Sequence, residues 1–423
     1  MLDIHWLRQY PQEARERLRT RGRGDEGLLD RLLELDEELR AVIHSVEALR
    51  AQRNQVSREI GFRRGREEPP AELLSAMRSL GKRIEEDEGK RQRLEEEVKD
   101  LLLLLPNLPH PTVPVGSDPE ANPTVRSWGT PRSFSFAPKP HWEIGEKRGW
   151  FDFAAAVKLA GSGFALFRGE GARLQRALIR FMLDLHTREH GYTEIWPPFL
   201  VRGEVAVGSG HLPKFAEEMY HIPSDDLYLL PTAELALANL HREEVLPQSG
   251  LPLRYVAYSP CFRREAGSAG KDTRGLLRIH QFEKVELVQV TQPERSYEAL
   301  EELVHHAEKV LQRLEIPYRI VLLCSGDMGF GAAKCYDLEV WAPGVGAWLE
   351  VSSCSNLEDF QARRMNLRYK PDPPGKLRYC HTLNGSGTAL PRLLAALLEN
   401  HQEEDGRVLL PAAFRAYYEK ELV

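Results

Sequence analysis

The residues best suited to chemistry lie between two apolar stretches in the second half of the chain. Arg263 and Glu265 close the first stretch, and the second, residues 277–287, alternates apolar and polar residues as a strand does. Because side chains on a strand repeat every two residues, we expect Arg263 and Glu265 to share one strand face. A guanidinium beside a carboxylate can bind a phosphate together with an amine. The same two groups could instead form a cross-strand ion pair.

A glycine-rich loop, residues 266–275, joins these two predicted strands and carries Lys271, Asp272 and Arg274. It is too long for a tight hairpin turn. Loops of this length inside a compact domain are usually functional or disordered. The sequence therefore predicts an antiparallel hairpin with a long loop at its tip.

Polar residues also occur where a helix begins. Thr232-Ala233-Glu234 precedes a helical run, where Thr232 or Pro231 could begin the helix and Glu234 would favour its positive end. Arg392 lies in the first turn of an apolar helix that follows a glycine-rich strand end. The free N–H groups of such a helix end suit phosphate, so this arginine is a second candidate phosphate ligand.

Two predicted strands carry isolated acids. Glu286 lies in an otherwise apolar stretch, where an unpaired carboxylate is costly. A ligand ammonium or hydroxyl would be a natural partner, because Lys284 on the same face is expected to be too mobile to serve alone. Glu350 and Ser352 are expected to point one way along another strand. A carboxylate near phosphates favours Mg²⁺, which prefers oxygen ligands.

Residues 262–286, FRREAGSAGKDTRGLLRIHQFEKVE, resemble motif 2 of class II aminoacyl-tRNA synthetases, and the seryl-tRNA synthetases in particular. Residues 172–198 run helix, glycine, strand, proline, which is similar to motif 1, the dimer interface of that family. Residues 382–392, TLNGSGTALPR, are similar to motif 3, although Pro391 stands where a small residue would be easier to accept. Thr-Ala-Glu at 232–234 resembles the family's serine-binding loop. The resemblance covers nearly the whole chain.

The resemblance implies a serine–tRNA ligase. Such an enzyme activates L-serine with ATP to seryl-adenylate, releases pyrophosphate and transfers serine to tRNA(Ser), with tRNA(Sec) as a further expected substrate. Mg²⁺ is the expected cofactor, and five scattered cysteines without a CxxC pair favour the zinc-free type. Two alternatives stay open. A ligase that charges a carrier protein would lack the long arm described below, and a non-catalytic RNA-binding paralogue would have lost Arg263 and Arg392.

The resemblance also implies a role for individual residues. Arg263 would hold the α-phosphate and Arg392 the γ-phosphate, which makes them the catalytic pair. Glu265 would read the adenine amino group and Phe282 would stack on the ring. Glu350 and Ser353 would bind the metal ion. The expected ATP site comprises Arg263, Arg264, Glu265, Ile279, Phe282, Glu350, Val351, Ser352, Ser353 and Arg392. The expected serine site comprises Thr232, Ala233, Glu234, Arg263, Glu286 and Ser386.

The N-terminal quarter has the clearest periodicity in the chain. Apolar residues recur at steps of three and four from Leu32 to Ile60 and again from Leu73 to Leu105, which is heptad spacing. Residues 61–70 between the two series are rich in helix breakers. We therefore predict an antiparallel coiled-coil arm over about residues 28–105, roughly 50 Å long at ~1.5 Å per residue.

The far end of this predicted arm is basic. Six arginines occur from Arg50 to Arg66 against one acid, Glu59. Guanidinium groups suit RNA phosphates, although charged faces of coiled coils are often merely solvated. In the related family the arm of one subunit of a homodimer guides tRNA to the active site of the other. The expected tRNA contacts are Arg53, Arg58, Arg63, Arg64, Arg66, Lys271 and Arg274.

Most of the predicted strands follow one another in sequence and are joined as hairpins, which predicts an antiparallel sheet with helices packed on it, an α+β fold. We expect a class II synthetase antiparallel sheet flanked by helices and preceded by the coiled-coil arm. The expected domains are an N-terminal tRNA-binding domain at 1–105, a proline-rich linker at 106–135 and a catalytic domain at 136–423.

The composition of the chain limits the expected binding partners and cellular compartment. The net charge of −6 means that a nucleic-acid partner needs a local basic surface. The odd number of unpaired cysteines argues against a disulfide framework and for a reducing compartment. No apolar run approaches ~20 residues and the first residues lack the apolar core of a secretory signal, so we expect a cytoplasmic protein without membrane spans.

Overall fold

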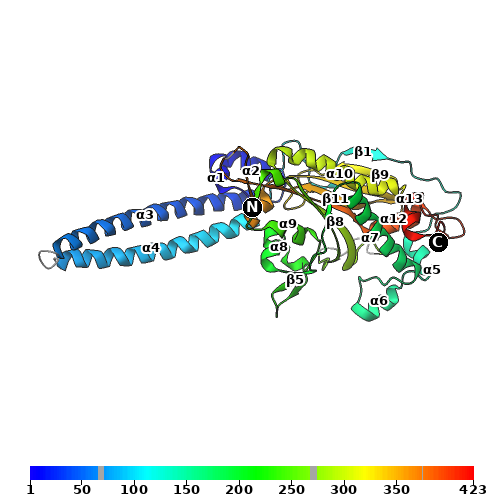
Figure 1. Ribbon diagram of the computed structural model, residues 1–423, viewed down its shortest axis with the longest axis horizontal. Coiled ribbons are helices and arrows are strands. Elements are labelled where there is room, and N and C mark those ends of the chain that lie inside the picture. The colour runs from blue at the N-terminus through cyan, green and yellow to red at the C-terminus, as the bar shows by residue number, and fades with distance from the viewer. Residues whose placement is uncertain (65–70, 267–273, 374) are drawn as a thin grey trace. The chain divides into compact units, whose positions relative to one another are not determined.

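A computed structural model describes residues 1–64, 71–266, 274–373 and 375–423 (Figure 1). The described chain forms two compact units. One consists of Leu2–Arg19 and Arg23–Pro106, and the other consists of Met1, Thr20–Gly22 and Asn107–Val423. Below, the first is called the arm unit and the second the catalytic unit.

The arm unit is built from two short helices, α1 (Ile4–Gln9) and α2 (Pro11–Arg19), and two long ones, α3 (Glu26–Arg64) and α4 (Ala71–Leu104). With 39 residues, α3 is about 58 Å long at ~1.5 Å per residue. Figure 1 shows α3 and α4 running side by side in opposite directions. The predicted coiled coil is confirmed. Its seam buries Leu32, Leu35, Leu39, Val42, Val46, Leu49, Ile60, Ile84, Leu94 and Val98.

Polar residues interrupt the apolar seam and pair across it. The hydroxyl of Ser45 donates to Oδ2 of Asp87 at 2.7 Å. The guanidinium of Arg50 lies 2.6 Å from the carboxylate of Glu88. Asp87 occupies a heptad position that an apolar residue would normally take, and its contact with Ser45 explains why α4 accepts it.

The catalytic unit is organised around one eight-stranded sheet (Figure 1). Six of the pairings between neighbouring strands are antiparallel, and the pairing of β2 with β7 is parallel. The predicted α+β class is therefore confirmed. In spatial order the strands are β1 (Thr124–Trp128), β9 (Tyr318–Leu322), β10 (Lys334–Ala342), β11 (Ala347–Asn356), β14 (His381–Ala389), β8 (Gln281–Thr291), β7 (Leu253–Phe262) and β2 (Thr193–Glu194).

Helices cover this sheet and close its core. Three amphipathic helices, α7 (Glu170–Arg188), α10 (Ser296–Arg313) and α12 (Leu390–Asn400), bury aliphatic faces against β7, β8, β10, β11 and β14. The other helices are α5 (His141–Lys147), α6 (Phe153–Ala160), α8 (Gly203–Ser209), α9 (Glu234–Ala238), α11 (Phe360–Met365) and α13 (Ala412–Tyr418). One small sheet contains β6 (Val245–Pro247), β12 (Arg368–Lys370) and β13 (Arg378–Tyr379). A second small sheet contains β3 (Leu200–Arg202), β4 (His221–Ile222) and β5 (Leu227–Leu229).

The central hairpin departs from the prediction at its tip. Strand β7 ends at Phe262, so Arg263 and Glu265 do not lie on a strand face. Glu265 has a φ of 50°, a left-handed conformation that cannot continue a strand. The returning strand begins at Gln281 instead of residue 277. The amide of Arg263 donates to the carbonyl of His280 at 2.9 Å, and the chain leaves the sheet beyond this bond.

Candidate active site

The catalytic unit contains a cavity of about 400 Å³ over the sheet. Its walls come from the tips of β7 and β8, from β11, from β14 with the start of α12, and from the residues that precede α9. Most of the predicted site residues lie in it, although they are spread over 160 positions of the sequence. Those that line the cavity are Thr232, Glu234, Arg263, Glu265, Ile279, Phe282, Glu286, Glu350, Val351, Ser353, Ser386 and Arg392.

One end of the cavity is buried and carries an ionic cluster. Nζ of Lys284 lies 2.5 Å from the carboxylate of Glu286 and donates to Oγ1 of Thr232 at 3.1 Å. Only 8% of Lys284 is exposed. The expectation that this lysine is too mobile to serve Glu286 is therefore wrong. Alternation along β8 places both side chains on one face, and burial of the lysine stem fixes the ammonium there.

A second acid joins this cluster. Glu234 is buried at the start of α9, and Oε1 accepts a hydrogen bond from Nε2 of Gln361 at 2.7 Å. Burial raises the pKa of both Glu234 and Glu286, and the Lys284 ammonium opposes that rise. Burial also lowers the pKa of the neighbouring His211 to about 3, so this ring is neutral at pH 7. Arg263 also lowers the pKa of Glu234. The two acids, Glu234 and Glu286, are buried at one end of the cavity, which favours a ligand with its own positive charge.

The other end of the cavity is more open and richer in arginine. The guanidinium of Arg263 lies 5.1 Å from the centre of the Phe282 ring, and its Nε donates to the carbonyl of Pro231 at 3.4 Å. Arg392 donates to the carbonyls of Glu350 at 2.9 Å and Leu277 at 3.2 Å. These carbonyls orient the two guanidinium groups without neutralising them.

A third arginine and two acids complete this end. Nη1 of Arg278 lies 3.1 Å from Oε2 of Glu265, and Nη1 of Arg392 lies 3.6 Å from Oε2 of Glu350. With Arg263 the described lining residues at this end carry three guanidinium groups against two carboxylates. Ala389, Pro391 and Arg392 bring the first turn of α12 to the same wall. Pro391 fits there because the first helical turn does not need its N–H. A polyphosphate is the complementary ligand.

A β-bulge in β11 changes which residues reach the cavity. Leu338 of β10 pairs with Ser352 and Glu339 pairs with Glu350, so Val351 is the extra residue. The alternation therefore shifts, and Glu350 and Ser353 line the cavity while Ser352 does not. The expectation that Glu350 and Ser352 point one way is wrong for this reason. The Ser352 hydroxyl instead donates to the carbonyl of Ser386 at 2.7 Å.

The residues around Glu350 suit a hard cation. Asp337 of β10 lies opposite Ser353 in the sheet register, and burial, followed by the nearby Glu350 carboxylate, raises the pKa of Asp337. Carboxylate and hydroxyl oxygens are the donors that Mg²⁺ prefers, and it takes its other ligands from water and phosphate. The described residues contain no cluster of three or more His, Cys, Asp or Glu side chains that could hold a metal by themselves.

Three residues of the predicted site lie outside the cavity lining. Arg264 places its guanidinium 5.7 Å from the Tyr220 ring, and its amide donates to the carbonyl of Glu218 at 2.9 Å. Ala233 is buried at the N-cap of α9. Ser352 contacts the cavity wall only through its hydrogen bond to the carbonyl of Ser386.

The structure describes only some of the residues predicted to contact RNA. Arg53 and Arg58 are exposed on α3. Arg274 is exposed, with its guanidinium 5.0 Å from the Trp142 ring. The side chains of Arg63 and Arg64, and the whole of Arg66 and Lys271, lie outside the described residues.

The cavity also contains residues that sequence reasoning missed. Lys284 could have been found, because it lies two positions before Glu286 on the same strand face. Ser355 has the same signal, two positions after Ser353, and Pro391 lies within motif 3. The others reach the cavity through the path of the chain, which the sequence pattern does not give. The missed lining residues are His211, Leu276, Leu277, Arg278, Lys284, Ser355, Asn384, Ala389 and Pro391.

Comparison with known proteins fits this geometry. Residues 1–109 match the seryl-tRNA synthetase N-terminal domain, and residues 218–401 match the tRNA synthetase class II core domain of the G, H, P, S and T enzymes. A serine–tRNA ligase of Methylacidiphilum infernorum is 58% identical over 421 residues, which cover 100% of both chains. The chain belongs to the seryl-tRNA synthetase family. It is therefore a class II aminoacyl-tRNA synthetase, as its motifs predicted.

Further members of the seryl-tRNA synthetase family agree. A serine–tRNA ligase of Geobacillus kaustophilus is 53% identical over 99% of this chain and 98% of its own. The crystal structure of seryl-tRNA synthetase from Pyrococcus horikoshii complexed with ATP has a TM-score of 0.95 at 42% identity, over 100% of this chain and 99% of that one. Within the described residues, no helix has the length and apolar character needed to cross a membrane.

Proposed function

We propose that this seryl-tRNA synthetase activates L-serine with ATP and transfers the seryl group to tRNA(Ser). The observation that carries the proposal is the opposite charge of the two cavity ends. The buried end contains two carboxylates, Glu234 and Glu286, which suit the ammonium of an amino acid. The open end has a surplus guanidinium for a polyphosphate. Arg263 lines the cavity with both groups, where the carboxylate of serine and the α-phosphate of ATP would meet.

The first step needs alignment more than covalent help from the protein. An oxygen of the serine carboxylate forms a bond to the α-phosphorus, and the bond from that phosphorus to the bridging oxygen breaks, so pyrophosphate leaves. Arg263 neutralises the developing charge at the α-phosphate, and Arg392 holds the γ-phosphate of the leaving group. In the second step a terminal hydroxyl of tRNA attacks the seryl carbonyl and AMP leaves.

Similar proteins support the nucleotide part of this proposal. The Pyrococcus horikoshii enzyme was solved with ATP, and a cytoplasmic serine–tRNA ligase of Naegleria fowleri, 31% identical with a TM-score of 0.89, was solved with AMP. We assign ATP to the arginine-rich end, with Glu265 at the adenine amino group and Phe282 stacked on the ring. Glu350 and Ser353 would hold Mg²⁺, which adds charge neutralisation on the phosphates. The zinc-free assignment stays a prediction.

The serine part of the proposal assigns the buried cluster to the amino acid. Thr232, Glu234 and Glu286 would surround the ammonium and hydroxyl of serine, with Ser386 closing the site from β14. The two buried acids support this assignment. The carrier-protein alternative is disfavoured by the match to a serine–tRNA ligase over the whole chain, arm included, and the paralogue is disfavoured by Arg263 and Arg392 in the cavity.

The arm and the assembly are assigned by family likeness. We propose that α3 and α4 bind tRNA(Ser), and tRNA(Sec) as well, in the cytoplasm, and that residues 1–105, 106–135 and 136–423 act as arm domain, linker and catalytic domain. In a homodimer the arm of one subunit would guide tRNA to the active site of the other. Exposed apolar side chains on α6 and after β2, Leu159 (78%) and Trp196 (69%), support a subunit interface there.

ATP–pyrophosphate exchange with each amino acid in turn tests the activation step. We expect serine alone to support rapid exchange. A preference for another amino acid would overturn the serine assignment, and the lack of any exchange would favour the paralogue. Transfer to tRNA compared with transfer to a carrier protein separates the remaining alternative.

Salt dependence of RNA binding tests the arm. Replacing exposed Arg53 and Arg58 by alanine should reduce the slope of log affinity against log salt, by up to ~0.9 for each phosphate that the variant no longer neutralises, the value for duplex B-DNA. Replacement of Arg31, which pairs with Glu34 near the start of α3, is the matched control and should leave the slope unchanged. Equal slopes in both variants would mean that the distal arginines are only solvated.

A further inference from the structure

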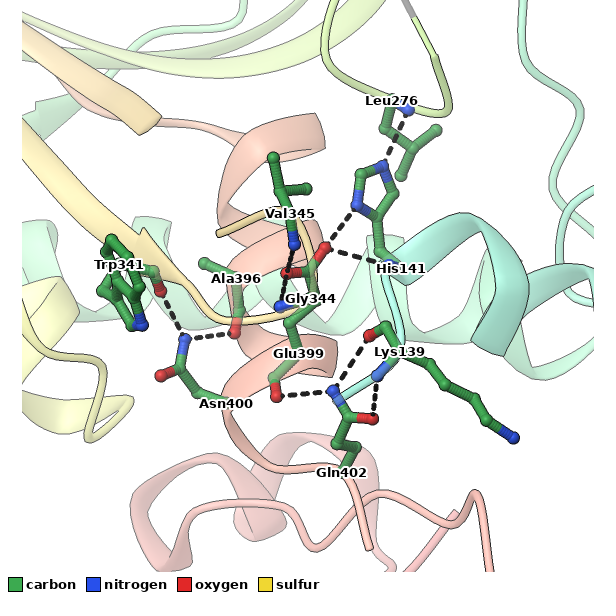
Figure 2. Close-up of polar contacts among 10 residues, drawn as sticks. All are labelled: Lys139, His141, Leu276, Trp341, Gly344, Val345, Ala396, Glu399, Asn400 and Gln402. Atoms are coloured by element: carbon green, nitrogen blue, oxygen red, sulfur yellow. Dashed lines mark hydrogen bonds and ion pairs between the residues drawn. The ribbon is translucent and has the colours of Figure 1, made fainter. Parts of the chain in front are cut away.

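The C-terminal end of α12 contains a buried carboxylate that the activation chemistry does not use (Figure 2). Glu399 is fully buried. Oε1 accepts from the amide of His141 at 2.9 Å, and Oε2 accepts from the amides of Gly344 at 2.8 Å and Val345 at 3.1 Å. The same Oε1 lies 2.7 Å from Nδ1 of His141. Four donors thus satisfy this carboxylate, as burial requires.

The contacts of His141 fix its tautomer. The amide of Leu276 donates to Nε2 of His141 at 3.0 Å. Because a backbone N–H can only donate, Nε2 must carry a lone pair, and the proton must lie on Nδ1, where it is donated to Glu399. The ring is therefore neutral and bridges two elements. Figure 2 shows the path from Glu399 on α12 through the imidazole to Leu276.

In the segment that contains Leu276, residues 274, 276 and 277 each contact a neighbouring element, and Gly275 lies too close to His141 to carry a side chain. The Arg274 guanidinium lies over Trp142, the neighbour of His141. Gly275 has a φ of +65°, and a Cβ there would lie 2.5 Å from Nε2 of His141. Leu276 donates to the same nitrogen, and the carbonyl of Leu277 accepts from Nε of Arg392. Both ends of α12 therefore hold one short segment.

This segment forms a wall of the nucleotide end. Leu276 and Leu277 line the cavity, and the Leu277 carbonyl orients Arg392. The serine end takes its side chains from other places, namely β8, β14 and residues 232–234. A shift of Leu276 should therefore disturb the grip on ATP and leave the serine contacts in place. Displacements near 1 Å at such positions can cost up to ~10²-fold in rate.

We propose that His141 is a positioning residue for ATP in the activation step. Glu399 fixes the orientation of the His141 ring, and the ring fixes the position of the Leu276 amide. The position of Leu276 determines that of the Leu277 carbonyl, which orients the Arg392 guanidinium. The proposal rests on the assignment of the arginine-rich end to ATP. It gives the buried end of α12 a part in nucleotide binding, in addition to its packing.

Two conservative variants separate the two bonds of the ring. In His141→Asn the side-chain amide can take the place of Nδ1 and donate to Glu399, but no acceptor reaches Leu276. In His141→Gln the carbonyl oxygen can take the place of Nε2 and accept from Leu276. In serine-dependent exchange we expect His141→Asn to raise KM for ATP roughly tenfold, the scale of removing one buried hydrogen bond, with KM for serine within about twofold of wild type. His141→Gln should return KM for ATP toward the wild-type value.

The matched control is His401→Asn. His401 follows α12 and its Nε2 donates to the carbonyl of Leu314 at 2.9 Å, away from the cavity lining. Its replacement should affect stability without changing either KM. Hydrogen exchange gives a readout independent of activity: the Leu276 amide should be protected in wild type and in His401→Asn, and should lose protection in His141→Asn.

The possible results of these experiments either support or overturn the positioning role of His141. A folded His141→Asn with wild-type KM for ATP and a protected Leu276 amide overturns the proposal. Equal losses for ATP and serine would show a general structural role and overturn it as well. If His141→Asn does not fold, Gly275→Ala crowds the same ring from the segment side and must raise KM for ATP alone. If wild-type protein does not exchange with serine, the proposed function fails, and the amide readout still tests the hold of His141 on Leu276.

Discussion

The two ends of the cavity, to which serine and ATP are assigned in the proposed function, hold their charges in different ways. At the serine end the charges are buried and already contact one another, as in the Lys284, Glu286 and Thr232 cluster. At the nucleotide end the charges are partly exposed, and backbone carbonyls orient Arg392. A buried cluster in low dielectric is costly to leave unsatisfied, so it can reject a ligand that lacks one polar group. An open cluster of guanidinium groups supplies attraction and charge neutralisation instead.

This difference predicts which variable each end controls. Changes at the nucleotide end should act on the rate of adenylate formation and on ATP. Changes at the serine end should act on selectivity and on pH dependence. A variant at one end that changed the kinetic parameters assigned to the other end would show that the two ends work as one unit.

The largest effect is expected at Arg263, which belongs to both ends. Arg263→Ala should lower adenylate formation by at least ~10²-fold, the scale of removing one preorganised donor at developing charge. Single-turnover pyrophosphate release measures this rate. Arg264→Ala is the matched control: its guanidinium lies over Tyr220 outside the cavity lining, so its loss should be far smaller. Equal losses in the two variants would contradict the assignment of Arg263.

The next effect concerns discrimination at the serine end. Glu286→Gln keeps the shape of the side chain but removes its charge. It should raise KM for serine strongly, leave KM for ATP nearly unchanged and weaken rejection of alanine, because sites that pair with a substrate hydroxyl can discriminate by roughly 10⁴-fold. Exchange kinetics with serine, alanine and threonine measure all three quantities. A variant with wild-type serine KM and wild-type rejection of alanine would remove Glu286 from the site.

Sequence patterns predicted the two units of the protein unequally well. The coiled coil follows from local periodicity, because each heptad residue such as Leu35 or Val46 is buried by its neighbours on two helices. The cavity depends on long-range events. The bulge at Val351 exchanges Ser352 for Ser353, and the left-handed Glu265 takes the hairpin tip off the sheet. The motifs named most of the lining residues by resemblance, but they could not give the Lys284 contact or the hold of His141 on Leu276.

A third prediction uses the charge balance of the buried cluster. The Lys284 ammonium lowers the pKa of both Glu234 and Glu286 against the effect of burial. In Lys284→Met both pKa values should rise further, so fewer carboxylates are ionised at a given pH. In the proposed function the serine ammonium binds the ionised carboxylates, so the acidic limb of kcat/KM for serine should move to higher pH, while KM for ATP changes little. An unmoved acidic limb in a folded variant would show that Lys284 does not set these pKa values.

The smallest effect is expected in stability without ligands. Burial raises the folded-state pKa of Glu286 above its ordinary value of 4.5, so the folded state binds the proton more tightly than the unfolded state. The contribution of this group to stability is fully present below about pH 4.5 and is lost as pH rises through the folded pKa. Glu286→Gln removes that titration, so the free energy of unfolding of the variant relative to wild type should improve as pH rises above 4.5. Denaturant unfolding at one protein concentration measures it.

An acid with the opposite shift makes this last measurement decisive. Arg242 lowers the pKa of the exposed Glu204 through a hydrogen bond at 2.7 Å. Its contribution to stability is present above the ordinary pKa of 4.5 and is lost as pH falls through the lower folded value. Glu204→Gln should therefore approach wild-type stability as pH falls, whereas Glu286→Gln should gain on wild type as pH rises. If the free energy of unfolding relative to wild type varied with pH in the same way for both variants, burial would not raise the pKa of Glu286. The difference between the two cavity ends would then be supported only by their geometry.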